Sequence, residues 1–301
     1  RLFRNGQYYG VYLALEDPED EYIERQGRDG PLYKSYSTDT PPASIAEYYN
    51  TYRKQARAQE SYADLVAFIS RINSLSGTAL RDFVRQNIDV DQVARFCAIN
   101  SVLGNLDWGH KNHYFFRDRA TGLWEFAPWD MDLTMGKNWP PCQSVFCHDG
   151  QYNHTLIMGM SGTSVYNKVA DSVLQDPAAQ QLVKDYVKVI LQEEFTPEKM
   201  HPWVDALYDL ISDETIEEVR RFRSFSNQMT EAQYWQQRDV IKQWVIQRRA
   251  FLMPQLLGPV KELRAEPLEG NRVRLTWIPE PGTQKVRVRV DRKALALRDV
   301  P

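Results

Sequence analysis

Residues 104–132, GNLDWGHKNHYFFRDRATGLWEFAPWDMD, constrain the fold of this chain more than any other stretch. Within it, HYFFRD (residues 113–118) and LWEFAPWD (residues 123–130) alternate apolar and polar side chains around the turn sequence RATG, which predicts two paired strands. An apolar helix is predicted before them, at residues 89–105, with acidic residues in its first turn and Gly104 near its end. Strands placed between helices in this way predict an α+β fold.

Further elements are predicted on both sides of this hairpin. An Asn-Gly turn at residues 5–6 precedes a predicted strand at 8–16, and a second strand ends near Lys34. Apolar residues with a 3.6-residue period predict helices at 44–59, 62–75 and 78–86, and most of residues 165–256 is predicted helical. Residues 142–164, rich in Gly, Ser, Met and His, are predicted to be an irregular loop.

A domain boundary is predicted at the dipeptide Gly258-Pro259. Residues 1–257 then form one domain, with an N-terminal β part at 1–35 and a helical part that carries the polar motifs at 36–257. Residues 258–301 show three short alternating strands that resemble the opening strands of a fibronectin type III sandwich. Such a sandwich needs about 100 residues, so this segment is either a truncated sandwich or a small appended β-unit.

Composition narrows the class of protein. The chain has 301 residues, of which 43% are hydrophobic and 26% charged, as in an ordinary globular protein. A net charge of −3 argues against nucleic acid as a partner, and no apolar stretch approaches the ~20 residues that span a bilayer. Because the sequence begins at Arg1, directly on strand-like sequence, we expect it to be a fragment of a longer protein.

The three cysteines fall into two groups. Cys97 lies in an apolar helical run and is predicted to be a buried thiol. Cys142 and Cys147 flank a loop, so they either form a short disulfide or remain free thiols. Zinc is the lesser alternative, because His148 and His154 do not supply a second ligand pair with the usual spacing.

Polar residues within 104–132 predict chemistry. Asp107 and Asn112 stand five residues apart, which is the spacing of the protein-kinase loop whose Asp handles the acceptor hydroxyl and whose Asn holds a magnesium ion. Asp130 follows one hairpin later, and Asp132 would share its strand face if residues 129–133 were extended. Carboxylate and amide oxygens suit Mg²⁺, and Lys111 is positioned to reach a γ-phosphate.

Each of these residues also has an ordinary structural explanation. Asp and Asn beside a turn or at a helix end commonly act as caps, and Trp124 and Trp129 are predicted to pack in the core. What favours a functional site is their occurrence together within 26 residues, at residues 107–132.

Several segments resemble, in order and spacing, the CotH kinase family of spore coat protein H-like atypical protein kinases: NGQYYGVYLALE, DGPLYK, GNLDWGHKNHYFFRD and TGLWEFAPWDMDLTMG. The resemblance covers roughly residues 1–250. It implies a diverged, two-lobed kinase fold that uses ATP and Mg²⁺ (or Mn²⁺) to phosphorylate Ser or Thr of a partner protein.

The resemblance also implies roles for individual residues. Asp107 matches the catalytic-loop aspartate, Asn112 the metal-binding asparagine, and Asp130 takes the place of the DFG aspartate. From its position two residues after Asp130, Asp132 is expected to be either a second metal ligand or an orienting residue. Lys111 is assigned to the catalytic group.

On the nucleotide side, Lys34 in GPLYK matches the lysine that pairs with the α- and β-phosphates. Its carboxylate partner is either Glu47 or Glu16. NGQYYG departs from G-x-G-x-x-G, so this segment is not expected to cradle phosphates in the usual way.

Three classes of function remain open. The first is ATP-dependent phosphoryl transfer to a hydroxyl of a protein or, chemically, of a sugar or small molecule. The second is a non-catalytic surface or adhesion module that binds a protein or glycan, which the appended β segment and an expected extracellular or spore-associated location favour. A metal-dependent phosphoesterase is the third, although the expected histidine ligands are missing from the pattern.

Overall fold

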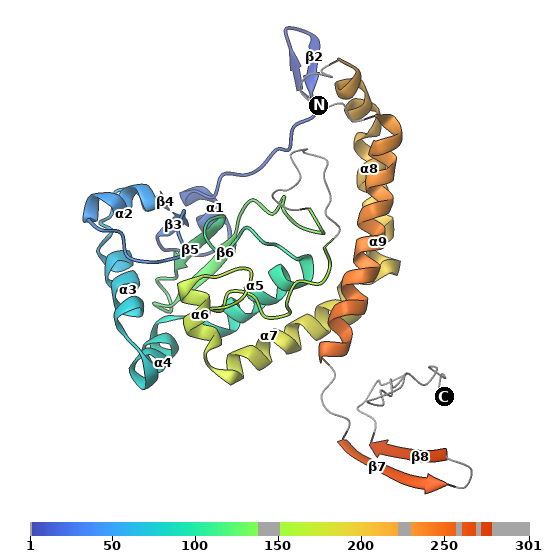
Figure 1. The fold of residues 1–301 in the computed structure, drawn as a ribbon. Coiled ribbons are helices and arrows are strands. Elements are labelled where there is room, and N and C mark those ends of the chain that lie inside the picture. The colour runs from blue at the N-terminus through green and yellow to red at the C-terminus, as the bar shows by residue number, and fades with distance from the viewer. Residues whose placement is uncertain (1, 138–150, 222–229, 257–260, 269–271, 279–301) are drawn as a thin grey trace. The chain divides into compact units, whose positions relative to one another are not determined.

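A four-stranded antiparallel sheet carries the predicted site residues in the computed structural model (Figure 1). Its strand order is β4-β3-β5-β6, so β3 lies inside the sheet and pairs with both β4 and β5. The strands are β3 (Leu32–Ser35), β4 (Tyr52–Ala56), β5 (His113–Arg117) and β6 (Trp124–Pro128). Lys34 lies opposite Tyr114 of β5, and this register brings Lys34 toward the polar motifs that flank the β5–β6 hairpin.

The structure describes residues 2–137, 151–221, 230–256, 261–268 and 272–278. Contacts divide the chain into two compact units, Arg1–Pro254 and Gln255–Pro301. No helix among the described residues is long and apolar enough to cross a membrane. Cys142, Cys147 and His148, with their disulfide, free-thiol and zinc alternatives, lie outside the described residues.

Helices make up most of the first unit. Those before β5 are α1 (Asp20–Arg25), α2 (Ile45–Thr51), α3 (Ala63–Ser74), α4 (Gly77–Asn87) and α5 (Val90–Leu103). Those after β6 are α6 (Lys168–Leu174), α7 (Pro177–Val189) with a π-helical turn Ile190–Glu194, α8 (Pro197–Arg221) and α9 (Glu231–Leu256). The last two lie side by side, joined by the ion pair of Lys242 with Asp205 (Figure 1).

Two short hairpins lie outside the four-stranded sheet in the described chain. The N-terminal hairpin is β1 (Leu2–Arg4) and β2 (Gln7–Gly10), turned at Asn5 and Gly6, which both have positive φ. In the second unit β7 (Lys261–Leu268) pairs with β8 (Arg272–Ile278). The chain is therefore a mixture of helices and antiparallel strands, which confirms the predicted α+β class.

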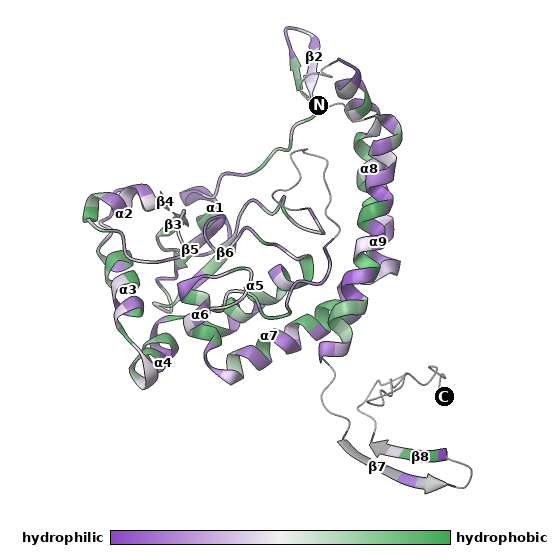
Figure 2. Cartoon of the chain, viewed as in Figure 1, coloured by the Kyte–Doolittle hydropathy of each residue, from purple (hydrophilic) through white to green (hydrophobic). Residues whose placement is uncertain are grey.

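The two faces of the four-stranded sheet pack differently. One face carries an aromatic cluster in which Phe126 stacks on Phe96 of α5 (4.9 Å between ring centroids) and Trp124 stacks on Phe68 of α3 (4.6 Å). Hydrophobic residues run along α5 in Figure 2, consistent with its buried position. The opposite face packs Leu32 and its neighbours against α1 in a smaller cluster. The predicted burial of Trp124 and Cys97 is confirmed, and burial raises the pKa of the Cys97 thiol to about 12.

Two predicted elements were wrong. The strand predicted at residues 8–16 ends at Gly10, and residues 11–18 form no regular element. The helix predicted at residues 44–59 ends at Thr51, where β4 begins. Pairing with β3 selects the extended conformation there, because it buries alternate residues Tyr52, Lys54 and Ala56. Of the three strands predicted after residue 258, two are described.

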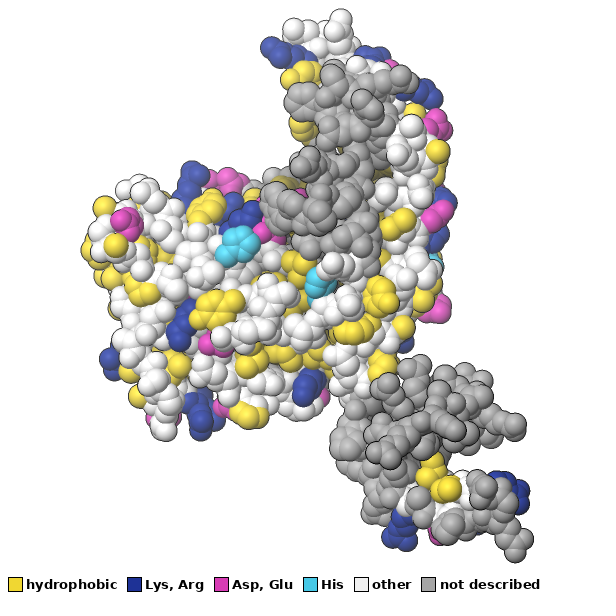
Figure 3. Space-filling model, in the orientation of Figure 1, with side chains coloured by type: hydrophobic (Ala, Val, Ile, Leu, Met, Phe, Trp, Pro, Cys, Tyr) yellow, Lys and Arg dark blue, Asp and Glu magenta, His cyan; other side chains and the backbone are white. Residues whose placement is uncertain are grey.

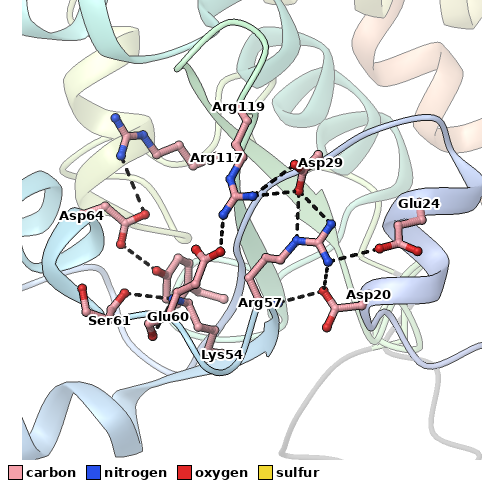
Figure 4. A network of polar contacts seen from close by, with 11 residues as sticks. Asp20, Glu24, Asp29, Lys54, Arg57, Glu60, Ser61, Asp64, Arg117 and Arg119 are labelled. Carbon is pink, nitrogen blue, oxygen red and sulfur yellow. Dashed lines mark hydrogen bonds and ion pairs between the residues drawn. The ribbon is translucent and has the colours of Figure 1, made fainter.

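Ion pairs link the far end of this sheet to α1 (Figure 4). Arg57, just after β4, pairs with Asp29 and Asp20, and Arg119, from the β5–β6 turn, pairs with Asp29 and Glu60. These guanidinium groups lower the pKa of the Asp29 carboxyl. Lys and Arg are interspersed with Asp and Glu on the described part of the face in Figure 3, as a net charge of −3 leads one to expect.

Candidate functional site

The site begins where α5 ends. Gly104 adopts a left-handed conformation (φ 62°) that terminates the helix, as its position in the sequence predicts. The buried Asn105 then donates to Asn100 Oδ1 (2.8 Å) and accepts from the backbone N of Asp107 (3.0 Å). Asn105 was not among the predicted site residues, although it stands two residues before Asp107 in the sequence. These bonds fix the start of the loop formed by residues 107–112.

Asp107 is almost completely buried, with 2% of its surface exposed. Its Oδ2 accepts from Asn112 Nδ2 (2.6 Å) and lies 3.2 Å from Lys111 Nζ. Its Oδ1 lies 3.4 Å from His110 Nε2 but has no hydrogen-bond partner among the described residues. A buried carboxylate oxygen without a donor is costly, so this atom is suited to bind a hydroxyl or a cation.

Asp130 and Asp132 follow β6. The backbone N of Trp129 donates to Asn112 O (3.1 Å) and ties the end of β6 to the 107–112 loop. Residues 129–133 are not extended as the strand-face expectation required, because Asp130 has φ 53° and the chain turns at the next residues. The two carboxylates are nonetheless close enough to interact. Partial burial, then Asp132 and then Asp107, raise the pKa of Asp130.

Lys34 lies near the same carboxylates. Its Nζ is 4.9 Å from the ring centroid of Trp129 and 5.2 Å from that of Tyr36. The charges of Lys111 and Lys34 both lower the pKa of Asp130, in part opposing the other effects. The structure thus brings together the predicted residues Asp107, Lys111, Asn112, Asp130, Asp132 and Lys34. Trp129, predicted to be a core residue, is only partly buried and contacts this group.

Neither predicted carboxylate partner of Lys34 pairs with it among the described residues. Glu47 caps α2, because its carboxylate accepts from Ala43 N (2.8 Å). Glu16 forms an ion pair with Arg25.

A pocket of about 450 Å³ opens on the α1 side of the sheet. Lys34 is not part of its lining but lies beside it, because Tyr114, which is opposite Lys34 in the sheet, and Trp129 both line the pocket. Its apolar lining includes Tyr22, Tyr114, Phe116 and Trp129, and its charged lining is Glu16, Arg28 and Glu125. Trp129 lines the pocket and also underlies the Lys34 ammonium. Trp129 therefore links the apolar, aromatic surface of the pocket to Lys34.

A magnesium ion suits the donor set around Asp130. In the described chain, no group of three or more His, Cys, Asp or Glu residues is placed to hold a metal, so carboxylates alone do not form a closed site. Mg²⁺ ordinarily takes only one or two carboxylates and completes its shell with water and phosphate oxygens. Asn112 uses its Nδ2 on Asp107, which leaves its amide oxygen as the coordinating atom. Burial is the largest cause of the raised pKa of Asp130, and the negative charges of Asp132 and Asp107 add to it; a bound cation would relieve this crowding of charge.

Comparison with known proteins identifies a family and a relative. The family model described as CotH kinase protein matches residues 1–252. The "Inner spore coat protein H" of Bacillus subtilis (strain 168) is 26% identical to this chain over 216 residues, which are 69% of this chain and 56% of that protein. The chain therefore spans little more than half the length of this curated relative.

Proposed function

The chain belongs to the CotH kinase protein family, and we propose that it is an atypical kinase that transfers the γ-phosphate of ATP to a Ser or Thr hydroxyl of a partner protein. The observation that carries this proposal is the buried Asp107, whose Oδ2 is anchored by Asn112 and Lys111 while Oδ1 has no donor among the described residues. The proposal also assigns the chain a diverged, two-lobed kinase fold.

The pocket beside Lys34 supports nucleotide as the phosphate donor. Its aromatic lining offers stacking and apolar contact to a base, and its volume of about 450 Å³ is in the range of small-ligand sites. The Lys34 ammonium lies over the ring of Trp129, which lines the pocket, and it would there neutralise the phosphates that are not transferred. Glu16 lines this pocket and Glu47 caps a helix, so only Glu16 retains a place near the nucleotide in this proposal.

Asn112, Asp130 and Asp132 would hold Mg²⁺ or Mn²⁺. The ion, when bound, neutralises negative charge on the phosphate oxygens during transfer. Asp107 orients the acceptor hydroxyl through Oδ1 and receives its proton as the new oxygen–phosphorus bond forms and the bond to the leaving ADP breaks. Lys111 holds Oδ2 of Asp107 and lies where it would contact the γ-phosphate.

A non-catalytic surface module is the second candidate. The relative from Bacillus subtilis is named for the inner spore coat, which favours a structural role and a spore-associated location for this chain. A protein or glycan would then be the partner. A scaffold of this kind has no need for a buried carboxylate oxygen without a hydrogen-bond donor among the described residues, such as Oδ1 of Asp107, so we favour the enzyme.

Labelled ATP tests the proposal. Purified protein incubated with γ-labelled ATP and Mg²⁺ or Mn²⁺ should phosphorylate itself or a generic protein acceptor. Asp107→Ala should lower this rate by about 10²- to 10⁴-fold, the usual contribution of a general base. Asp209→Ala, which changes an exposed aspartate of α8, is the matched control and should leave the rate unchanged. If ATP with either metal neither transfers phosphate nor raises the melting temperature, the binding-module alternative is favoured instead.

A further inference from the structure

Asp39 is a fully buried carboxylate outside the set of residues predicted from the sequence. It follows β3 and lies in a left-handed conformation (φ 64°). Its Oδ1 accepts from Ser35 Oγ (2.8 Å), and its Oδ2 accepts from Asn167 Nδ2 and lies 3.2 Å from His113 Nε2. All four of these side chains have 0% exposure, so a buried polar cluster is centred on one carboxylate.

This cluster holds the backbone of the 107–112 loop. His113 Nδ1 lies 2.9 Å from Trp108 O and 3.2 Å from Lys111 O, while Nε2 on the other side of the ring faces Asp39. Asn167 Nδ2 donates to Gly109 O (3.0 Å) as well as to Asp39. Three carbonyls of the loop are thus bound by two side chains that both contact the Asp39 carboxylate.

Asn167 and Gly109 are themselves held firmly. Asn167 Oδ1 accepts from the backbone N of Val169 (3.0 Å) and Ala170 (3.1 Å), which caps α6 and fixes the direction of its Nδ2. A Cβ at Gly109 would lie 2.7 Å from Tyr166 O, so the loop packs directly on the backbone before α6. The loop therefore has little freedom to relax if the cluster is broken.

We propose that Asp39 is a positioning residue. Through His113 and Asn167 it holds the backbone of the loop, and the loop in turn fixes the orientation of the Asp107 and Asn112 side chains at its two ends. The inference rests on the proposed function for its effect on rate. Asp39 has no hydrogen bond to Asp107, Asn112 or Lys111 side chains, so its effect passes through loop backbone. Direct contact with substrate is not part of the role.

Hydrogen exchange tests the positioning without depending on activity. In Asp39→Ala, amides of residues 108–112 and 168–170 should exchange about tenfold faster or more, while those of α5 keep their protection. Asp64→Ala is the matched control, because Asp64 also accepts a side-chain bond, from Tyr33 (2.7 Å), but shares none with the loop. Equal loss of protection throughout the chain, or no change in the loop, would overturn the proposal.

Kinetics test the consequence for transfer. With rates corrected for the folded fraction by near-ultraviolet circular dichroism, Asp39→Ala should lower kcat about 10- to 100-fold, as small misplacements of reacting groups do. The KM for ATP should stay within about twofold, because the Asp39 carboxylate contacts Ser35, His113 and Asn167, and none of these three residues lines the pocket. Faster loop exchange with an unchanged kcat would also overturn the proposal.

Two further outcomes remain decisive. If Asp39→Ala does not fold, Asp39→Asn replaces it. The side-chain NH₂ of the introduced Asn can donate to the Ser35 hydroxyl, while its oxygen faces His113 and Asn167. A smaller increase in the exchange rate of the same backbone amides is then expected. If the unmodified protein transfers no phosphate, the proposed function fails, and the exchange measurement alone decides whether Asp39 holds the loop.

Discussion

Asp130 shows how a single residue joins backbone geometry to electrostatics. Its positive φ turns the chain immediately after β6, so that its carboxylate approaches Asp132 and Asp107 instead of continuing along a strand. Burial and these two charges raise its pKa, while Lys111 and Lys34 lower it. Such crowding of like charge is unfavourable in the apoprotein, and it is the arrangement that a bound cation stabilises.

Asp130→Asn should therefore change stability in opposite ways with and without Mg²⁺. The pKa of Asp130 is higher in the folded than in the unfolded chain, so the folded chain favours the protonated carboxyl. This contribution to the free energy of unfolding is fully present below the pKa of the unfolded chain. It is lost as the pH rises through the pKa of the folded chain. At neutral pH without metal, Asp130→Asn should raise the melting temperature slightly, and this gain should vanish near pH 4. The rise in melting temperature caused by Mg²⁺ and ATP should be lost.

Thermal unfolding between pH 4 and pH 8, with and without the metal, measures these effects. Asp209→Asn serves as control, since Asp209 is exposed on α8. The same measurement on Asp132→Asn shows which of the two carboxylates carries more of the metal response. An Mg²⁺ response in Asp130→Asn equal to that of the unmodified chain would contradict the assignment of Asp130.

Residues of the site differ in how far the sequence reveals them. Asp107 and Asn112 could be predicted because a single short loop sets their separation, and they form a direct hydrogen bond. The turn at Asp130 could not, since nothing local to WDMD requires a positive φ there. Asp39 could not be predicted from the sequence for a different reason. It contacts Asn167, 128 residues away, and only the folded chain brings the two together.

At the scale of the element, local pattern and tertiary pairing compete. The helices α3 and α4 match the predicted 3.6-residue periodicity closely, because each presents an apolar stripe to the core. The helix α5 matches the apolar helix predicted at residues 89–105 and is buried over most of its length. Residues 52–56 were predicted to continue a helix. They form an edge strand instead, because β3 offers them backbone hydrogen bonds. Lys54 is buried in that strand and donates to Glu60 O and Ser61 O, a local bond pattern that sequence periodicity does not encode.

Arg248 joins α9 to α5. It is fully buried, and its guanidinium donates to the carbonyls of Ser101 (2.6 Å), Tyr152 (2.7 Å) and His154 (2.6 Å). Burial lowers the pKa of Arg248 to about 10, which leaves it charged at neutral pH. Arg248→Ala should reduce the free energy of unfolding by about 3 kcal/mol, because three buried acceptors lose their donor.

Urea unfolding followed by circular dichroism measures this loss. Arg249→Ala is the matched control, since the neighbouring Arg249 is less buried and its hydrogen bond to Phe195 O is long (3.5 Å). It should change the free energy of unfolding by less than about 0.5 kcal/mol. Equal effects of the two substitutions would mean that the buried guanidinium does not hold α9 against α5.

At the scale of the whole molecule, the core belongs to the first unit. The buried hydrophobic residues of the described chain run from Ile23 to Leu252, within the unit Arg1–Pro254. The described part of the second unit is the hairpin of β7 and β8, and a two-stranded hairpin is only marginally stable by itself. A unit with its own core is expected to fold independently.

Truncation after Leu256 should consequently leave a folded protein. Residues 1–256 keep every residue assigned to phosphate transfer, the pocket beside Lys34 and the bonds of Arg248. We expect this fragment to unfold cooperatively, with a melting temperature within about 3 °C of the 301-residue chain, and to show the same rise on addition of ATP and Mg²⁺. Differential scanning calorimetry of both proteins makes the comparison. Aggregation of the fragment, or a nucleotide response confined to the longer chain, would mean that residues 257–301 contribute to the first unit.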